Sequence, residues 1–343
     1  MTEGALARLA PLAALSDDRL AELAGLAVVR RVERGADVRA ALDPAHASFL
    51  LGGELLLVFE GGGTLVVVGG SPEASHPLAR RKPALARTKA ITDVDVVSFD
   101  DEMLDIAATW DQVVKGRDQA ANGGDASLFR GAFSLGSLRS GALAQLPAAH
   151  IDELLRRFEK VQVARGETVI HEGDDGDYYY VIESGRFQVE RLVGGAKVVL
   201  AELKAGDAFG EEALVSDARR NASVTALGAG QLLRLRRADF NQSLRQPLLR
   251  RLPFAEASGV VRAGGVWLDV RYPSEYQYDG LPGAMNVPLA QVRDSFSVLD
   301  RSRDYIAYCR TGRRSAAAAF LFSQRGFKVS LLDGGLKAVA AGK

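Results

Sequence analysis

Residues 171–185 read HEGDDGDYYYVIESG, and this stretch indicates how the middle of the chain folds. The run at 178–182 is apolar and aromatic, which is typical of a short strand. Gly173, Gly176 and Gly185 lie on either side of that run. Glycine adopts the backbone of a tight turn more readily than any other residue. The stretch therefore predicts a short strand between tight turns.

The landmarks around this stretch occur a second time upstream. The matched pairs are 20–23 (LAEL) with 151–154 (IDEL), 32–35 (VERG) with 163–166 (VARG), Gly53 with Gly185, and Ala90 with Ala226. Their offsets are 131, 131, 132 and 136 residues, in the same order along the chain. Ordered landmarks with small insertions indicate an internal duplication. The sequence therefore predicts two copies of a domain of about 120 residues.

Each copy contains short β-rich runs separated by glycine, and each ends in a helical pattern. The strand-like runs are 49–51, 55–59 and 65–68 in the first copy, and 178–182, 187–189 and 198–200 in the second. The helical patterns are 100–108 and 237–244. Short strands at about ten-residue spacing predict a β-roll of the jelly-roll kind with flanking helices. Residues 122–125 (NGGD) and 246–253 are the expected joints.

The pattern changes after residue 256. Strand-like runs at 266–270, 285–287, 305–308 and 328–332 alternate with helical segments, notably 315–325. Such alternation predicts an α/β domain with a central parallel sheet. The expected domains are therefore 1–118, 126–248 and 256–343.

Composition narrows the class of protein. The 343 residues contain 43 Lys and Arg, 43 Asp and Glu, and a single cysteine, Cys309. Zero net charge argues against general nucleic-acid binding. A lone cysteine makes neither an internal disulfide nor a cysteine-based zinc site, so we expect a reducing compartment and no metal. The charged beginning is a poor signal peptide and no long apolar run occurs, so we expect a cytoplasmic protein with no membrane contact.

Residues 209–224 of the second copy contain the elements of an anion site. Gly210 and Glu211 open a GExAL stretch that can begin a helix, whose free N–H groups and positive dipole end suit a phosphate. Arg220, nine residues after Glu211, can add charge-assisted hydrogen bonds. The alternative is that Glu211 and Arg220 form only a surface ion pair.

These residues, with the turn motif at 173–185, resemble the phosphate-binding cassette of cyclic nucleotide-binding domains over about 143–248. The resemblance implies that Arg220 pairs with the cyclic phosphate and that Glu211 binds the ribose 2′-hydroxyl. The family has Ala, Ser or Thr directly after this arginine, where this chain has Asn221. We expect cAMP rather than cGMP as the ligand. The implied ligand-binding set is Gly210, Glu211, Glu212, Ala213, Leu214, Arg220, Asn221 and Ala222.

The first copy lacks this cassette. Its residues 71–93 contain no GExAL, and Ala84 aligns with Arg220. We therefore expect residues 1–118 to be a degenerate copy that keeps the roll but not the ligand. A basic run occurs there instead, and it is either a solvated face or another anion site. Its members are Arg80, Arg81, Lys82 and Arg87.

Residues 309–315 of the α/β domain read CRTGRRS and follow a strand-like run directly before a helical one. Successive N–H groups that end at a helix N-terminus form a cradle for an anion. Amide dipoles and arginines stabilise a thiolate, so we expect the pKa of Cys309 to be lowered. The alternative for a lone cysteine is a small buried apolar residue.

This loop, together with LDVR at 268–271, EY at 275–276, GAMNVP at 283–288 and LDGG at 332–335, resembles the rhodanese-like family of sulfurtransferases. The resemblance implies that Cys309 carries a persulfide. With one cysteine, the sulfur must pass to an external acceptor. A cysteine phosphatase needs an arginine six residues after the cysteine, where this chain has Ser315. The implied catalytic set is Cys309, Arg310, Thr311, Gly312, Arg313 and Arg314.

Two functions remain open at the level of sequence, beside a third possibility, a structural scaffold with neither activity. The first is a cyclic-nucleotide-responsive regulator with a sulfurtransferase domain, in which the ligand biases the contacts of that domain. The second is a non-catalytic signalling protein whose rhodanese-like domain docks partners or senses persulfides. The sulfur donor and acceptor are not determined by the residues, and a homodimer is compatible with either function.

Overall fold

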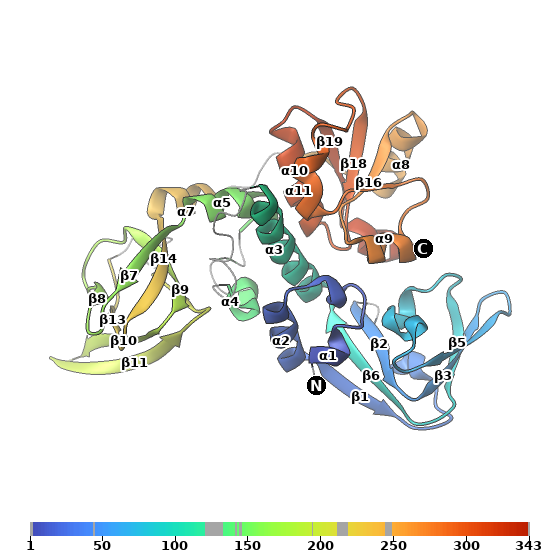
Figure 1. The fold of residues 1–343 in the computed structure, drawn as a ribbon, viewed down its shortest axis with the longest axis horizontal. Helices are drawn as coiled ribbons and strands as arrows, with labels where there is room; N and C mark the ends of the chain where they lie inside the picture. The colour runs from blue at the N-terminus through green and yellow to red at the C-terminus, as the bar shows by residue number, and fades with distance from the viewer. Residues whose placement is uncertain are drawn as a thin grey trace. The chain divides into compact units, whose positions relative to one another are not determined.

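The structure is a computed structural model that describes residues 3–43, 45–120, 133–140, 143, 146–193, 195–210, 219–243 and 249–341. Contacts divide the chain into two compact units, whose elements are labelled in Figure 1. One unit consists of residues 1–112 together with 249–343, and the other of residues 113–248. Most of the expected first domain and the expected third domain are therefore parts of one unit. The joint expected at 122–125 lies outside the described residues.

The first roll is built from antiparallel strands that follow α1 (Glu3–Leu6) and α2 (Asp17–Leu26). Within the described residues it has two three-stranded sheets. The order of the first is β1 (Val28–Val32), β6 (Val94–Asp100), β2 (His46–Gly52), and that of the second is β4 (Thr64–Val68), β3 (Glu54–Phe59), β5 (Leu85–Ala90). Helix α3 (Asp101–Ala120) follows β6 directly.

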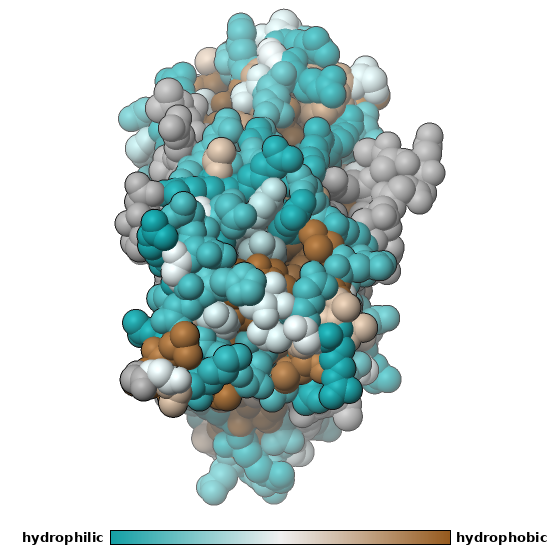
Figure 2. Space-filling view, turned by 90° about the vertical axis from the view of Figure 1, so that its left-hand side faces the viewer, coloured by the Kyte–Doolittle hydropathy of each residue, from teal (hydrophilic) through white to brown (hydrophobic). Residues whose placement is uncertain are grey.

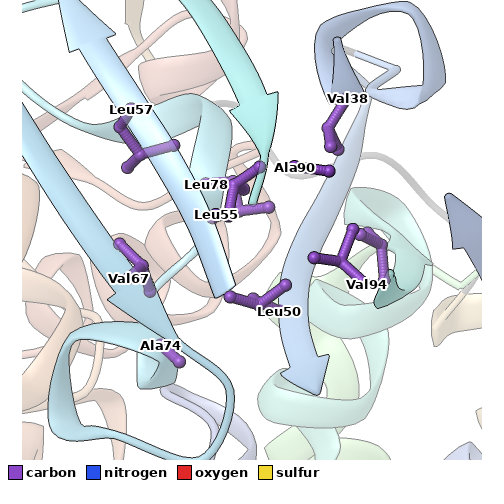
Figure 3. Packing of buried hydrophobic residues seen from close by; sticks show 10 residues of the cluster. Val38, Leu50, Leu55, Leu57, Val67, Ala74, Leu78, Ala90 and Val94 are labelled. Atoms are coloured by element: carbon purple, nitrogen blue, oxygen red, sulfur yellow. The ribbon is translucent and has the colours of Figure 1, made fainter. Parts of the chain in front are cut away.

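The core of the first roll lies between its sheets. Leu55 and Leu57 alternate with less buried residues along β3, so both side chains reach the same face. They pack with Val94 and Leu50 of the other sheet and with Leu78, as Figure 3 shows. Burial of such side chains from two sheets is what stabilises a roll of short strands.

The second roll follows α4 (Leu135–Ser140) and α5 (Ile151–Arg157), and α7 (Arg237–Ser243) follows its last strand. Its described strands form two four-stranded antiparallel sheets. One has the order β11 (Ala196–Lys204), β10 (Arg186–Val193), β13 (Ser223–Ala226), β8 (Thr168–Ile170). The other has the order β12 (Ala208–Phe209), β9 (Tyr178–Ser184), β14 (Gly230–Arg236), β7 (Glu159–Val163).

The two rolls share one pattern of strand pairing. In the first roll β6 pairs with β1 and β2, and β3 pairs with β4 and β5. In the second, β14 pairs with β7 and β9, and β10 pairs with β11 and β13. The N–H of Gly35 donates to the carbonyl of Ala90 at 2.8 Å, and that of Gly166 donates to Ala226 at the same distance. These are residues that the sequence comparison matched.

The α/β domain has a parallel sheet with the order β15 (Arg251–Leu252), β19 (Lys328–Leu332), β18 (Asp304–Tyr308), β16 (Val266–Asp269), β17 (Met285–Asn286). Its helices are α8 (Phe254–Arg262), α9 (Pro273–Asp279), α10 (Val292–Ser295), α11 (Arg313–Ser323) and α12 (Gly335–Ala341). Ile306 packs in the cluster that includes residues of α8 and α12, whereas Ala307 packs against α11. Successive residues of a strand face opposite sides, so helices cover both faces of the sheet.

The structure confirms the expected antiparallel sheets and the parallel sheet, and it differs at two places. Helix α3 continues to Ala120, well beyond the pattern at 100–108. Residues 251–252, expected within a joint, form the edge strand β15. A two-residue strand carries no recognisable period and depends on the neighbouring strand for its hydrogen bonds. The expected helix of the GExAL stretch lies outside the described residues.

The surface drawn in Figure 2 is largely hydrophilic, and its coloured apolar residues gather only in small separate patches. Among the described helices, none is both long and apolar enough to cross a bilayer.

Gly185 joins β9 to β10 with a φ of +96°, and a Cβ there would lie 2.9 Å from the Cα of Gly230. Gly166 has a φ of +82° but open space around it. We expect Gly185→Ala to destabilise the strands of the second roll by roughly 3 kcal/mol. Gly166→Ala should destabilise them by only about 1 kcal/mol, which is the cost of the left-handed backbone alone. Amide hydrogen exchange in these strands measures both, and equal effects would contradict the steric argument.

Candidate functional sites

The turn at 171–177 is bound edge-on to the segment that precedes β13. The N–H of Gly173 donates to the carbonyl of Arg220 at 2.8 Å, and the N–H of Arg220 donates to the carbonyl of Asp174 at 2.8 Å. The backbones of Asp175 and Arg219 form an isolated antiparallel β-bridge. The turn that the glycines predict therefore fixes the backbone of Arg220 on both sides.

The guanidinium of Arg220 lies inside the second roll. Its Nη1 donates to the carbonyl of Gly210 at 2.7 Å, and its Nη2 donates to the carbonyl of Tyr178 at 2.7 Å and to Asp177 Oδ1 at 3.1 Å. The residue is only 5% exposed. Three acceptors therefore hold one orientation of a charged group whose own carboxylate partner, Asp177, remains largely exposed.

Gly210 is necessary for this arrangement. Its φ is +93°, and a Cβ at this position would lie 2.7 Å from Nη1 of Arg220 and 3.1 Å from the carbonyl oxygen of Tyr178. Any side chain here would displace the guanidinium. The sequence identified Gly210 and Arg220 as one site, and the structure brings them into contact.

The rest of the expected ligand-binding set divides into two groups. Asn221 follows Arg220 on the exposed side of the roll, and Ala222 is buried. The other members lie outside the described residues, and they are Glu211, Glu212, Ala213 and Leu214.

The second candidate site is the loop between β18 and α11. Cys309 directly follows the last residue of β18 and has no exposed surface. Gly312, with a φ of +104°, caps the start of α11, and its N–H donates to the sulfur of Cys309 at 3.1 Å. The hydroxyl of Ser315 lies 3.7 Å from the sulfur. The thiol therefore lies at the helix N-terminus, as the sequence predicts, but it is completely enclosed.

The arginines of this loop are paired with acids of helix α3. Arg310 Nε lies 2.8 Å from Asp101 Oδ2, and Arg313 Nε lies 3.2 Å from Glu102 Oε2. Arg314 is deeply buried between Asp105 of α3 and Glu275 of α9. The sequence predicted that these arginines make the loop positive, whereas α3 neutralises them. The basic run of the first roll also contributes, because Arg80 pairs with Asp101 and is not on a solvated face.

Asp105 of α3 contacts the cysteine directly. Its Oδ2 accepts from the thiol of Cys309 at 3.4 Å, from the N–H of Thr311 at 3.2 Å and from the hydroxyl of Thr311. Its Oδ1 accepts from Arg314 Nε at 2.5 Å. Burial alone raises the pKa of this carboxyl, but Arg314 and the donors of Thr311 and Cys309 outweigh it, and the pKa lies below its usual value.

Burial raises the pKa of Cys309 to about 12, and the charge of Asp105 acts in the same direction. The expectation of a lowered pKa is therefore wrong for this arrangement, because it considered the loop without α3. A pattern was available in the sequence: Asp101 and Asp105 are four residues apart, on one face of a helix. Their partner could not be identified, since it lies about 200 residues further along the chain.

The motif at 268–271 has a structural role. Arg271 is buried and forms ion pairs of 2.7 Å with both Asp269 and Asp279. The amide of Asn286 donates to the carbonyls of Asp269 and Arg271 at 2.9 and 3.0 Å. These contacts join the end of β16 to α9 and β17.

The two candidate sites lie in regions of the chain that match known family models. Residues 160–246 match the family model of the cyclic nucleotide-binding domain, and residues 255–341 match that of the rhodanese-like domain. The thiosulfate sulfurtransferase PspE of Escherichia coli is 37% identical over 79 residues, which cover 22% of this chain and 76% of PspE. The chain therefore belongs to the rhodanese-like family through its α/β domain.

The second roll is a cyclic nucleotide-binding domain that resembles those of kinase regulatory subunits. The cAMP-dependent protein kinase regulatory subunit of Dictyostelium discoideum is 30% identical over 196 residues, 54% of this chain and 51% of that protein. The Thermus thermophilus catabolite activator protein, for which a crystal structure exists, is 32% identical in sequence to the matched part of this chain. The match covers 28% of this chain and 46% of that protein chain, with a TM-score of 0.27. The chain spans only 18–51% of the regulatory subunits of Mycosarcoma maydis and Dictyostelium.

The single thiol makes the raised pKa of Cys309 directly measurable. In protein labelled with ¹³C at cysteine Cβ, we expect the folded-state resonance to stay at its thiol position through pH 9, where an ordinary cysteine is half ionised. Asp105→Asn should lower the pKa, because a neighbouring negative charge is removed. A folded wild-type resonance that titrates below pH 9 would contradict the burial argument, and the urea-unfolded chain is the reference.

Proposed function

We propose that this chain is a cyclic-nucleotide-responsive regulatory protein whose rhodanese-like domain carries a persulfide on Cys309. The observation that carries the nucleotide part is the guanidinium of Arg220, held by two carbonyls beside a glycine that leaves room for it. A guanidinium oriented in this way presents paired donors to a phosphate. Glu211 would bind the ribose hydroxyl, with Glu212, Ala213, Leu214, Asn221 and Ala222 around the ligand.

The exposure of Asp177 supports exchange with a ligand. Its side chain is 66% exposed, whereas that of Arg220 is 3% exposed. The acid can therefore rotate into water while Arg220 keeps its carbonyl partners, and a cyclic phosphate can take its place. We propose cAMP as the preferred nucleotide, because the similar regulatory subunits are those of cAMP-dependent protein kinases.

We also propose that residues 1–118 are a degenerate copy of the nucleotide domain at 126–248, followed by the α/β domain at 256–343. The shared pairing pattern of the two rolls supports a common origin. So does the hydrogen bond between Gly35 and Ala90, which has its equivalent between Gly166 and Ala226. The first copy has Ala84 where the second has Arg220, so we assign it no nucleotide.

For the α/β domain we propose transfer of sulfur from an anionic donor such as thiosulfate. The thiolate of Cys309 attacks the outer sulfur, the sulfur–sulfur bond of thiosulfate breaks, and sulfite leaves with the electron pair. The persulfide that remains then passes its outer sulfur to an external thiol. The N–H of Gly312 and the N-terminus of α11 would stabilise the negative sulfur, with Thr311 and the arginines Arg310, Arg313 and Arg314 around it.

One observation favours a second candidate function. Cys309 has no exposed surface, and the loop arginines are already paired. A domain in this state would serve as a docking module whose partner choice the cyclic nucleotide controls, with no turnover.

Substitution of Arg220 tests the nucleotide site. Arg220→Ala should weaken cAMP binding by roughly 2–4 kcal/mol, since the phosphate loses its charge-assisted donors. Arg219→Ala is the matched control, because Arg219 is the adjacent, exposed arginine, and it should change affinity by less than about threefold. Calorimetry with cAMP and cGMP measures both. Equal affinities of the wild type and Arg220→Ala would refute the assignment.

Mass spectrometry after exposure to thiosulfate tests the sulfur chemistry. Because Cys309 is enclosed, we expect an adduct of one sulfur atom, about 32 Da, to form only slowly on the wild type, and none to form on Cys309→Ser. We also expect cAMP to change the rate of thiosulfate-to-thiol transfer in the wild type but not in Arg220→Ala. Absence of any adduct with thiosulfate and with organic persulfide donors would favour the docking module.

A further inference from the structure

Helix α3 of the first unit closes the Cys309 loop. The loop donors that an anionic ligand would use are the N–H and hydroxyl of Thr311 and the guanidinium of Arg314. Both donors of Thr311 and Nε of Arg314 donate to the carboxylate of Asp105, and so does the thiol of Cys309. The other two nitrogens of Arg314 donate to Glu275. The negative carboxylate of Asp105 thus occupies the place that an anionic ligand would take in the loop.

The carboxylate is also a barrier to chemistry at the sulfur. The side chain of Asp105 is 1% exposed and Cys309 is 0% exposed, so no donor molecule reaches the thiol while α3 is in place. A negative charge 3.4 Å from the sulfur disfavours the thiolate that must attack. The alternative, that Asp105 is a base that activates Cys309, requires a reagent to reach the sulfur beside it.

We propose that α3 is an autoinhibitory helix and that Asp105 is an internal substitute for the anionic sulfur donor, so that Cys309 reacts only when α3 withdraws. This inference rests on the proposed sulfur chemistry for its biological meaning. The closure itself can be measured without that chemistry, from the reactivity of the Cys309 thiol. Because the displaced group is a carboxylate, the cradle selects a donor of anionic character.

Contacts outside the cradle hold the helix in position. Asp101 pairs with both Arg80 and Arg310, and the hydroxyl of Tyr272 donates to Asp111 at 3.2 Å in a buried contact. The helix continues without interruption to Ala120, and its residues from 113 onward belong to the second unit.

Alkylation of the native protein tests the closure, because every modified thiol is Cys309. With neutral iodoacetamide at pH 8, we expect the wild type to react far more slowly than the urea-unfolded chain. Asp105→Asn keeps the shape of the side chain but removes its charge, and it should react at least about tenfold faster than the wild type. Glu102→Gln, on the same helix but in an exposed pair, should stay within about twofold.

Tyr272→Phe provides a second variant that leaves the cradle unchanged. It removes only one hydroxyl, which forms one of the contacts between α3 and the α/β domain. We therefore expect the alkylation rate to increase about three- to tenfold over the wild type. Thermal unfolding monitored by circular dichroism establishes that each variant is folded. If Asp105→Asn does not fold, Tyr272→Phe decides the question. A folded Asp105→Asn that reacts no faster than the wild type overturns the proposal. If Asp105→Asn does not fold, a Tyr272→Phe variant that reacts at the wild-type rate overturns it.

Parallel exposure to thiosulfate separates the two ideas. Faster alkylation of Asp105→Asn without a sulfur adduct supports the closure and refutes the sulfur chemistry. A sulfur adduct without faster alkylation refutes the closure and leaves the sulfur chemistry standing. Sulfur loading that is lost in folded Asp105→Asn, together with slower alkylation, would identify Asp105 as an activating base and overturn the autoinhibitory assignment.

Discussion

The buried ion pair between Arg314 and Asp105 is the interaction on which the first unit depends. Arg314 lies in the first turn of α11 of the α/β domain, and Asp105 lies on the helix that follows the first roll. Neither charge is tolerated in the interior without a partner, so separating the two parts of the chain carries a large energetic cost. Glu275 completes the pairing of Arg314 from α9. This requirement explains why residues 1–112 and 249–343 form one compact unit.

The two candidate sites apply the same chemistry with opposite accessibility. Each has an arginine directed at an acid, Arg220 at Asp177 and Arg314 at Asp105. The acid of the first pair is 66% exposed and that of the second 1% exposed. A surface carboxylate exchanges with a ligand phosphate by rotating one side chain. A buried one leaves only when its helix moves, so the second site is suited to control.

The two rolls also show how one strand pattern can take different roles. In the second roll the segment before β13 carries Arg220, which donates to Gly210 and Asp177. In the first roll the corresponding arginine is absent, and the helix after the last strand has become the cover of the Cys309 loop. Under the proposed duplication, the copy that lacks this arginine became the part that contacts the Cys309 loop.

Local patterns in the sequence determined the strands, the glycine turns and the parallel sheet, because each depends on neighbours or on a repeated spacing. They also placed Gly210 and Arg220 in one candidate site. The enclosure of Cys309 was decided only by the tertiary structure. Its partner Asp105 is 204 residues away and belongs to a different expected domain, where it looks like one acid of an ordinary helix. A pKa responds to the charges and the solvent around a group, and packing alone brings those two segments together.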